Sequence, residues 1–350
     1  MKKKCRIDEC RPGDIIAEDI YTEAGQFIIP ANTEANEYIL EKIRNFGIAT
    51  INIVERVKND ENASVSAQLE NLIIKDYRKN VKKIKTVLNG LASGRKLDIE
   101  TANEVAESVY NDIYSNFGIL ECLNRVRTSD EYTYTHCLNV SIYSMFIARW
   151  LGFEKEKVKE VVLAGLLHDV GKAKIPLTVL NKKGPLTPQE FELIKKHSTY
   201  GYDYVKNIDS LSEDIKNAVL MHHEKENGTG YPLGVTGEKI GLYAKIVAVA
   251  DIYDALTSER IYRPKLTPFD TFKEIEKVAV GTGLYDLKII LPFLSNISVY
   301  YTGAKVRMND GSIGTVVYVP PHNISTPVVQ LEEAYVDLKD NSTRKIVAII

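Results

Sequence analysis

The stretch Leu166-Leu167-His168-Asp169-Val170-Gly171-Lys172 constrains this chain more than any other. It ends an apolar, helix-forming run with a histidine, a carboxylate, a glycine and a lysine. Adjacent residues do not share a helix face, because neighbours on one face are three or four positions apart. At the last turn of a helix, however, His168 and Asp169 can both turn into one pocket, and Gly171 is expected to stop the helix and allow a tight turn. The ordinary alternative is a helix end with a core histidine and a surface Asp169–Lys172 pair, and this stretch alone does not decide between the two.

The order of expected elements indicates a mainly α protein with a small α/β domain at its N-terminus and a small β appendage at its C-terminus. Apolar residues recur at helical spacing from Leu69 to Leu88, and Thr187-Pro188-Gln189-Glu190 is a capping box that opens a helix through His197. Asn309-Asp310-Gly311, between two β-rich runs, predicts a hairpin with a primed turn. We expect four parts: a mixed β/α accessory domain at 1–58, a helical connector at 59–127, an all-helical domain at 128–299 and the β appendage at 300–350.

Composition limits the classes of function. Charged residues make up 26% and hydrophobic residues 44% of the 350 residues, as in ordinary soluble globular proteins. A formal net charge of −2 gives no electrostatic argument for binding duplex nucleic acid or an anionic membrane. No apolar run is long enough to cross a bilayer, so no membrane insertion is expected. The four cysteines form no C-x-x-C pair, which predicts a reduced, cytoplasmic protein.

Histidines gather in the expected central helices. Five of the six in the chain are found there: His136, His168, His197, His222 and His223. Each by itself is more often a satisfied core histidine than a ligand. Five together, with Asp169 and Asp251 also interrupting apolar helices, are hard to explain as core filling, because unpaired buried polar groups are costly. A metal site would satisfy neutral imidazoles and ionised carboxylates in one apolar cavity.

The number and type of these ligands suggest the chemistry. Seven nitrogen and oxygen ligands are too many for one ion and suit two octahedral ions, Fe or Mn, bridged by a carboxylate. No cysteine stands at ligand spacing, since Cys137 is expected to point away from His136, and this argues against a structural zinc. Two neighbouring ions favour phosphoester hydrolysis. Lys172 would then neutralise a phosphate oxygen or help to protonate the leaving group.

A loop rich in glycine follows the tandem histidine. Gly228, Gly230, Tyr231 and Pro232 come directly after His222-His223-Glu224. Such a loop can approach a ligand closely, and Tyr231 is placed to stack on a base or to bond a phosphate. Attached to the tandem histidine, the loop is expected to form a wall of the substrate site.

These motifs together resemble a known family. His168-Asp169 with Gly171-Lys172, and His222-His223-Glu224 with Gly230-Tyr231-Pro232, resemble the HD-GYP domain, a subgroup of the HD superfamily of metal-dependent phosphohydrolases. The resemblance covers about residues 132–264 and keeps the family's order of motifs. The other motifs are Tyr132-Thr133-Tyr134-Thr135-His136, Lys196-His197 followed by Gly201, and Asp251 to Thr257 with Arg260, Tyr262 and Arg263.

The resemblance implies hydrolysis of the bacterial second messenger cyclic di-GMP to pGpG or to GMP. It implies metal ligation by seven residues, with Asp169 as the bridge: His136, His168, Asp169, His197, His222, His223 and Asp251. It implies catalytic roles for Asp169 and Lys172, and substrate contacts by Lys172, Tyr231, Arg260 and Arg263.

The chain departs from the family's pattern at two positions, Ser198 and Lys225, where proline and arginine are usual; neither is a ligand. These departures leave open a catalytically weak nucleotide receptor. A separate alternative is a phosphodiesterase for another cyclic dinucleotide such as cyclic GMP-AMP, which only substrate competition would decide. A homodimer through the helical connector or the terminal domains is also expected.

Overall fold

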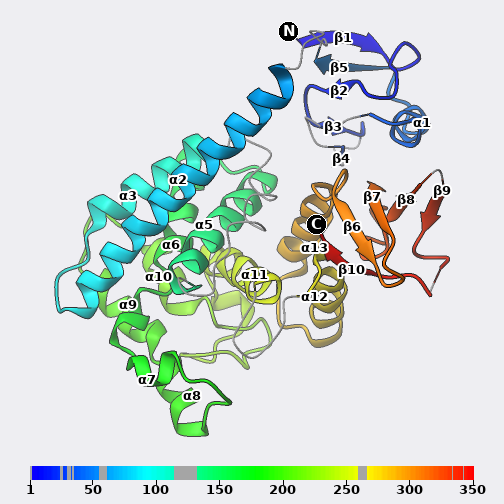
Figure 1. Ribbon diagram of the computed structural model, residues 1–350. Helices are drawn as coiled ribbons and strands as arrows, with labels where there is room; N and C mark the ends of the chain where they lie inside the picture. The colour runs from blue at the N-terminus through cyan, green and yellow to red at the C-terminus, as the bar shows by residue number, and fades with distance from the viewer. Residues whose placement is uncertain are drawn as a thin grey trace. The chain divides into compact units, whose positions relative to one another are not determined.

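The computed structural model describes residues 2–23, 27–29, 33, 35–54, 61–113, 132–258, 266–332, 334–341 and 343–350 (Figure 1). The chain divides into two compact units. Unit 1 combines residues 1–66, 266–274 and 294–350, and unit 2 combines residues 67–265 and 275–293. The expected fold class, mainly helical with small β parts near the two termini, is confirmed.

The N-terminal part of unit 1 is a small β/α structure. Strands β1 (Lys2–Arg6), β5 (Thr50–Val54) and β2 (Ile15–Ile16) form an antiparallel sheet in the order β1-β5-β2, and β3 (Ile20–Tyr21) pairs with β4 (Phe27–Ile29). Helix α1 (Glu37–Asn45) begins after Asn36, whose side chain accepts a hydrogen bond from the Ile39 amide at 2.8 Å. Buried residues of α1 and the strands share one apolar core.

The C-terminal part of unit 1 is an antiparallel sheet in the order β10-β6-β7-β8-β9. Tyr38 of α1 contacts Tyr318 and Tyr335 of this sheet, with ring centroids 5.6 and 5.5 Å apart. The N-terminal and C-terminal ends of the chain therefore share contacts in one unit. The strands are β6 (Lys305–Met308), β7 (Ile313–Tyr318), β8 (Val328–Leu331), β9 (Ala334–Asp337) and β10 (Ile346–Ile349).

Strands β6 and β7 pair as an antiparallel hairpin around Asn309-Asp310-Gly311, as predicted, but the turn between them is of another type. The Gly311 amide donates to the Met308 carbonyl at 3.0 Å, the Met308 amide donates to the Ser312 carbonyl at 2.9 Å, and Gly311 has φ of 86°. This is a three-residue loop that ends in a left-handed glycine, so the predicted primed turn was wrong. Only Gly311, rather than two successive residues, takes the left-handed conformation.

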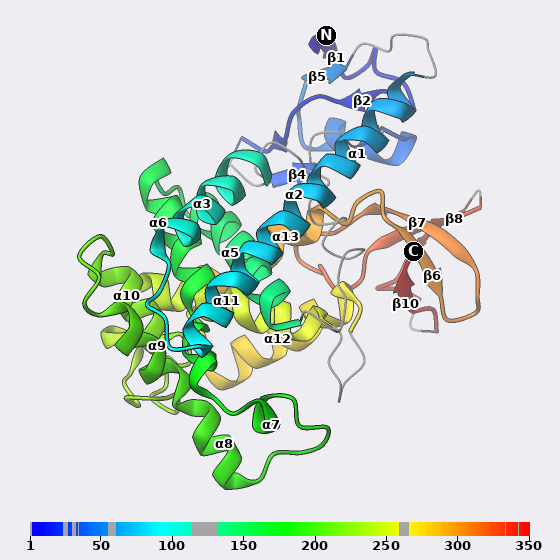
Figure 2. The ribbon, with the colours of Figure 1, turned by 60° about the vertical axis from the view of Figure 1, so that its left-hand side comes forward.

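Unit 2 consists of helices (Figures 1 and 2). Helix α5 packs against α6 and α11, and α10 packs against α9 and α11. None of the described helices is long and apolar enough to cross a membrane. The helices are α2 (Glu61–Ala92), α3 (Ile99–Ser108) with a π-helical turn (Val109–Ile113), α5 (Tyr132–Trp150), α6 (Lys155–Leu167), a 3₁₀ turn (Val170–Lys174), α7 (Leu177–Leu180), α8 (Pro188–Lys195), α9 (His197–Val205), α10 (Glu213–Met221), a 3₁₀ turn (Gly237–Lys239), α11 (Leu242–Thr257), α12 (Pro268–Thr282) and α13 (Leu287–Val299). Three of them, α2, α12 and α13, are divided between the units.

An aromatic cluster joins α5, α11 and α13 in the core of unit 2. The buried ring of Phe293 meets Tyr253 edge to face at 5.1 Å and Tyr143 at 6.5 Å, and Tyr143 meets Tyr253 at 4.9 Å. Edge-to-face pairs of buried rings add to the stabilisation that comes from area burial alone. The cluster fixes α11, which carries Asp251, against α5, which carries His136.

We predict that Phe293→Ala destabilises unit 2 by about 3–5 kcal/mol, because the substitution leaves a cavity among fixed rings. The midpoint of urea unfolding, followed by circular dichroism and by the fluorescence of Trp150, the single tryptophan, measures this. The control is Val280→Ala on α12, where the side chain is 68% exposed and the expected change is below about 0.5 kcal/mol. Equal midpoints for the two variants would contradict the prediction.

Candidate metal centre

The structure brings all seven predicted ligands to one buried site in unit 2. Five helices of the bundle supply them, mostly at helix ends. His136 lies on α5, His168 and Asp169 follow α6, His197 begins α9, His222 and His223 follow α10, and Asp251 lies on α11. The side chains of His136, His168, Asp169, His197 and His222 are almost completely buried, and those of His223 and Asp251 are partly exposed.

Asp169 lies at the centre of the cluster. Its Oδ2 atom lies 3.2 Å from Nε2 of His168 and 3.5 Å from Nε2 of His136, while its Oδ1 atom lies 3.4 Å from Nε2 of His197. The two oxygens therefore face two different groups of ligands. One group is His136, His168 and Asp251, the other is His197, His222 and His223, and within each group the ligand atoms lie within 4.8 Å of one another.

The residues fit a bound cation. The buried atoms His168 Nε2 and Asp169 Oδ1 have no hydrogen-bond partner, although buried polar atoms nearly always have one. The Nδ1 atoms of His168, His197 and His222 face the carbonyls of Gly165, Ile194 and Val219 at 2.7, 2.7 and 3.0 Å. Each ring therefore donates from Nδ1 and turns Nε2 into the site, which is the arrangement of a metal-binding histidine.

Burial favours the neutral form of the three histidines in the second group of ligands, His197, His222 and His223. It lowers the pKa of His222 well below its usual range and lowers the pKa of His223 to about 3. It also lowers the pKa of His197. These imidazoles are neutral at physiological pH, which is the form that binds a metal.

The carboxylates are held ionised. Burial raises the pKa of Asp169, but the Lys172 ammonium and His168 outweigh it and hold this pKa well below its usual range. Burial likewise opposes ionisation of Asp251, but its hydrogen bond to His136 lowers the pKa of this carboxyl well below its usual range. For His136, burial lowers the pKa, and the hydrogen bonds to Asp251 and Asp254 raise it to about 9. A cation at Nε2 would take the place of the proton shared with Asp251, which lies 3.2 Å away.

Helix ends explain the position of the histidines. The last carbonyls of a helix have no backbone donor within it, and a histidine at that end can use one of them. The sequence predicted one helix through His197, and this was wrong: α8 ends at Lys195 and α9 starts at His197. The His197 ring bonds the Ile194 carbonyl, which the backbone of a continuing helix would otherwise occupy.

Gly171 is needed for a reason other than the predicted tight turn. Its φ is not in the left-handed region, but a Cβ atom at this position would overlap the His197 carbonyl oxygen and the Gly201 amide nitrogen. The glycine therefore allows the turn after Asp169 to approach α9 closely. This approach brings His197 to the Oδ1 side of Asp169.

Lys172 and Tyr231 both border the ligand cluster. The Lys172 ammonium lies 2.5 Å from Oδ2 of Asp169, and the Tyr231 ring stacks on His223 with centroids 4.7 Å apart and an angle of 29° between planes. The two departures from the family pattern are accommodated: Ser198 is buried on α9, and the Lys225 ammonium donates to the Tyr285 hydroxyl at 2.9 Å. Arg260 and Arg263 lie outside the described residues.

Sequence reasoning missed the role of Glu224. This buried carboxylate accepts hydrogen bonds from the amides of Leu233, Gly234 and Val235 at 2.6, 3.1 and 3.2 Å. It therefore holds the loop that carries Tyr231 against the tandem histidine. Its position directly after His222-His223 was the available signal.

The sequence predicted that Cys137 points away from His136 and stands apart from the ligands, and this was wrong. Its sulfur lies within 4.8 Å of the ligand atoms of His168 and Asp169. Helix α5 is buried on nearly every side, so the residue after His136 also faces a neighbouring helix end. Burial and the Asp169 carboxylate raise the pKa of the Cys137 thiol.

Comparison with known proteins identifies the central region. The HD domain family matches residues 122–289. These residues are an HD domain. The chain is also 34% identical over 238 residues to a cyclic di-GMP phosphodiesterase of Pseudomonas aeruginosa, covering 68% of this chain and 57% of that protein. It is 37% identical over 180 residues to a cyclic di-GMP phosphodiesterase of Thermotoga maritima, covering 51% of this chain and 48% of that protein.

Two further similarities extend the comparison. The chain is 33% identical over 181 residues to a 3′3′-cGAMP-specific phosphodiesterase of Vibrio cholerae, covering 51% of this chain and 41% of that protein. The chain thus spans about half the length of the curated relatives it matches. A solved HDGYP protein of Bdellovibrio bacteriovorus shares the fold, with a TM-score of 0.53, 18% identity, and coverage of 85% of this chain and 99% of that one. The resemblance of the motifs to the HD-GYP group is confirmed.

We predict that Gly171→Ala lowers metal affinity by at least about tenfold. Losses of this size are typical when the groups that position a metal ligand are changed. The added Cβ pushes α9 away and moves His197 from Asp169. The rise in melting temperature on adding Mn(II) measures this, and it should be largely lost in the variant. The control is Gly241→Ala, where a Cβ meets no atom within 4 Å. An undiminished Mn(II) effect in Gly171→Ala would contradict the prediction.

Proposed function

We propose that the protein is a metal-dependent phosphodiesterase that hydrolyses cyclic di-GMP to pGpG or GMP. The position of Asp169, with one oxygen toward each group of ligands, carries this proposal. The relatives named cyclic di-GMP phosphodiesterases support the choice of substrate.

The proposed cofactor is a pair of divalent ions, Fe or Mn. His136, His168, Asp251 and Oδ2 of Asp169 would hold one ion, and His197, His222, His223 and Oδ1 of Asp169 the other. The seven ligands offer only nitrogen and oxygen atoms, a donor set that suits these metals. Bound there, the pair would activate a water molecule and stabilise negative charge on the phosphate oxygens.

The side chains around the ligands would bind and orient the substrate. Lys172 is partly exposed, so its ammonium can turn from Asp169 to a phosphate oxygen or supply a proton to the leaving oxygen. Tyr231, held by the loop that Glu224 fixes, can extend its stack from His223 to a base. Contacts by Arg260 and Arg263 are proposed from the resemblance alone.

One second candidate function has a specific observation in its favour. The Vibrio cholerae relative is named for 3′3′-cGAMP, so competition between the two cyclic dinucleotides is part of the test. A slow enzyme that acts as a nucleotide receptor is the other outcome to be separated. Cytoplasmic location and a homodimer stay predictions.

Hydrolysis of cyclic di-GMP by protein purified without oxygen, and supplied with Fe(II) or Mn(II), tests the proposal. We expect pGpG or GMP to form, and Asp169→Ala to lower the rate by more than about 10³-fold, beyond the loss of a single electrostatic contact. Metal binding should fall with it, because Asp169 faces both groups of ligands.

The matched control for this experiment is Asp203→Ala, also a single aspartate change, at an exposed residue of α9 that pairs with Lys206. It should retain both metal and turnover. Activity retained in Asp169→Ala would overturn the bridged site. Tight nucleotide binding without turnover would place the protein among receptors.

A separate prediction concerns Tyr231. Tyr231→Ala should raise KM for cyclic di-GMP about tenfold and change kcat little, since stacking of a base on an aromatic ring is worth about 1–3 kcal/mol. Tyr231→Phe keeps the ring and should keep KM, unless the hydroxyl bonds a phosphate. Steady-state kinetics of the two variants decide this, and an unchanged KM in Tyr231→Ala would remove Tyr231 from the substrate wall.

A further inference from the structure

A chain of buried hydrogen bonds connects helix α2 with His136. The Tyr77 hydroxyl donates to Oδ1 of Asn139 at 2.8 Å, and the Asn139 amide donates to Oδ1 of Asp254 at 2.9 Å. His136 Nδ1 lies 2.7 Å from Oδ2 of the same carboxylate. All four side chains are between 0% and 2% exposed, so this chain of hydrogen bonds is shielded from bulk water.

Asp254 decides which nitrogen of His136 faces the metal centre. A carboxylate that accepts the Nδ1 proton leaves Nε2 as the available ligand atom. Asp254 lies three positions after Asp251 on α11, and the two carboxylates contact the two nitrogens of the same ring. The His136 ring is thereby fixed in both rotation and tautomer.

Asn139 in turn fixes Asp254. It lies three positions after His136 on α5, on the same helix face. Because its oxygen accepts from Tyr77 and its nitrogen donates to Asp254, its amide has one orientation that satisfies both partners. Both oxygens of Asp254 are then held by α5, one directly through His136 and one through Asn139.

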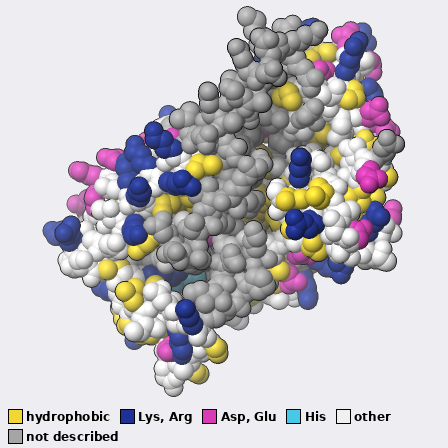
Figure 3. Space-filling view, viewed as in Figure 1, with side chains coloured by type: hydrophobic (Ala, Val, Ile, Leu, Met, Phe, Trp, Pro, Cys, Tyr) yellow, Lys and Arg dark blue, Asp and Glu magenta, His cyan; other side chains and the backbone are white. Residues whose placement is uncertain are grey.

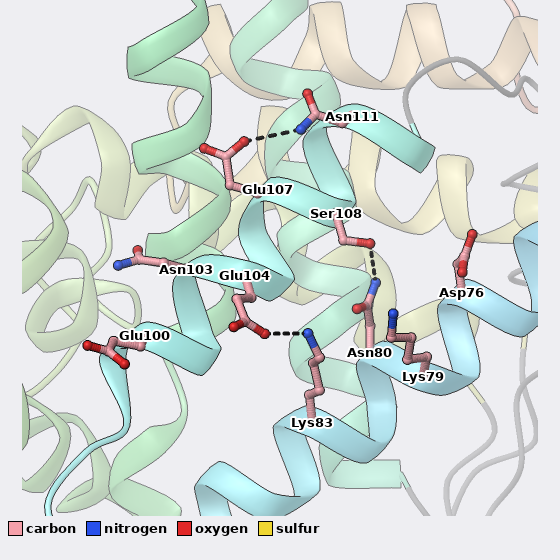
Figure 4. A pocket seen from close by; sticks show the side chains of 10 residues that line it. All are labelled: Asp76, Lys79, Asn80, Lys83, Glu100, Asn103, Glu104, Glu107, Ser108 and Asn111. Atoms are coloured by element: carbon pink, nitrogen blue, oxygen red, sulfur yellow. Dashed lines mark hydrogen bonds and ion pairs between the residues drawn. The ribbon is translucent and has the colours of Figure 1, made fainter.

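Tyr77 connects helix α2 to this chain of hydrogen bonds. It belongs to the buried face of α2, with Ile73 and Val81 one turn to either side. The next turns are tied to α3, since Asn80 donates to Ser108 at 3.0 Å and Lys83 pairs with Glu104 at 2.5 Å (Figure 4). The opposite face carries exposed cations, and Figure 3 shows Lys and Arg side chains gathered over this part of the surface. These exposed residues are Lys75, Arg78, Lys79 and Lys82.

We propose that Tyr77, Asn139 and Asp254 are positioning residues that hold His136 for metal binding, so that the seating of α2 sets the metal affinity of the centre. The inference rests on the proposed metal site, and it adds a helix that supplies no ligand. A displacement of α2 would remove the donor to Asn139, loosen Asp254 and leave His136 free to rotate.

Mn(II) titration of the full chain, with free Mn(II) read by electron paramagnetic resonance, tests the proposal without measuring activity. Tyr77→Phe keeps the buried ring and removes one hydroxyl. It should weaken Mn(II) binding about tenfold. This is the lower end of the loss of metal affinity that follows when a residue supporting a metal ligand by hydrogen bonds is removed. Asp254→Ala should weaken it by about 100-fold, because this change removes the direct partner of His136.

Tyr134→Phe is the matched control. The Tyr134 hydroxyl also joins α5 to α2, by donating to Asn89 at 3.1 Å, but this bond is exposed and does not extend to a ligand. Mn(II) affinity in this variant should stay within about twofold of the unsubstituted chain, because the bond that is lost is exposed and its acceptor, Asn89, does not contact the partner of a ligand.

A double variant separates positioning from general destabilisation. If Tyr77 acts through Asn139, Tyr77→Phe should cost no further affinity in an Asn139→Ala background. Equal affinities for Tyr77→Phe and Tyr134→Phe, or full additivity in the double variant, would overturn the inference and leave the proposed function standing. An unsubstituted chain that binds neither Mn(II) nor, without oxygen, Fe(II) would overturn both.

Discussion

The carboxylate of Asp169 is the group on which the site depends. Its two oxygens face two sets of ligands, and a lysine lies against one of them. An ionised carboxylate this deeply buried is stable only where cations or strong donors surround it. The neighbouring histidines turn their Nε2 atoms toward this carboxylate, and two of these atoms, those of His197 and His222, lie only 3.2 Å apart, an arrangement that fits bound cations. Helix packing, loop closure and the glycine at 171 all serve to keep this carboxylate between the two groups.

Most of the ligands reach Asp169 because helices end there. Histidines at the ends of α6, α8 and α10 satisfy carbonyls that the helix backbone leaves free, and this turns their other nitrogen toward the centre. Rigid helices thus fix each imidazole through the backbone, not through flexible loops. His136 is different, since it sits inside α5 and needs a side-chain partner, Asp254, for the same purpose.

Local sequence patterns were enough to predict the helical class, the capping box before α8 and the residues that form the cluster. Histidines and aspartates that interrupt apolar helices are visible in the sequence because burial without partners would be too costly. Contacts between distant residues were not predictable in this way. The Tyr77–Asn139 bond joins residues 62 positions apart, and the His136–Asp254 contact joins residues 118 apart. The overlap that excludes a side chain at Gly171 and the approach of Cys137 to Asp169 likewise depend on how helices pack.

The most direct test of the central claim is electron paramagnetic resonance of the protein loaded with Mn(II) without oxygen, together with a count of bound metal. Bridging by Asp169 predicts two ions per chain and a spectrum of an exchange-coupled pair, because one carboxylate connects them. One ion per chain with the spectrum of an isolated Mn(II), unchanged at saturating metal, would contradict the bridged site.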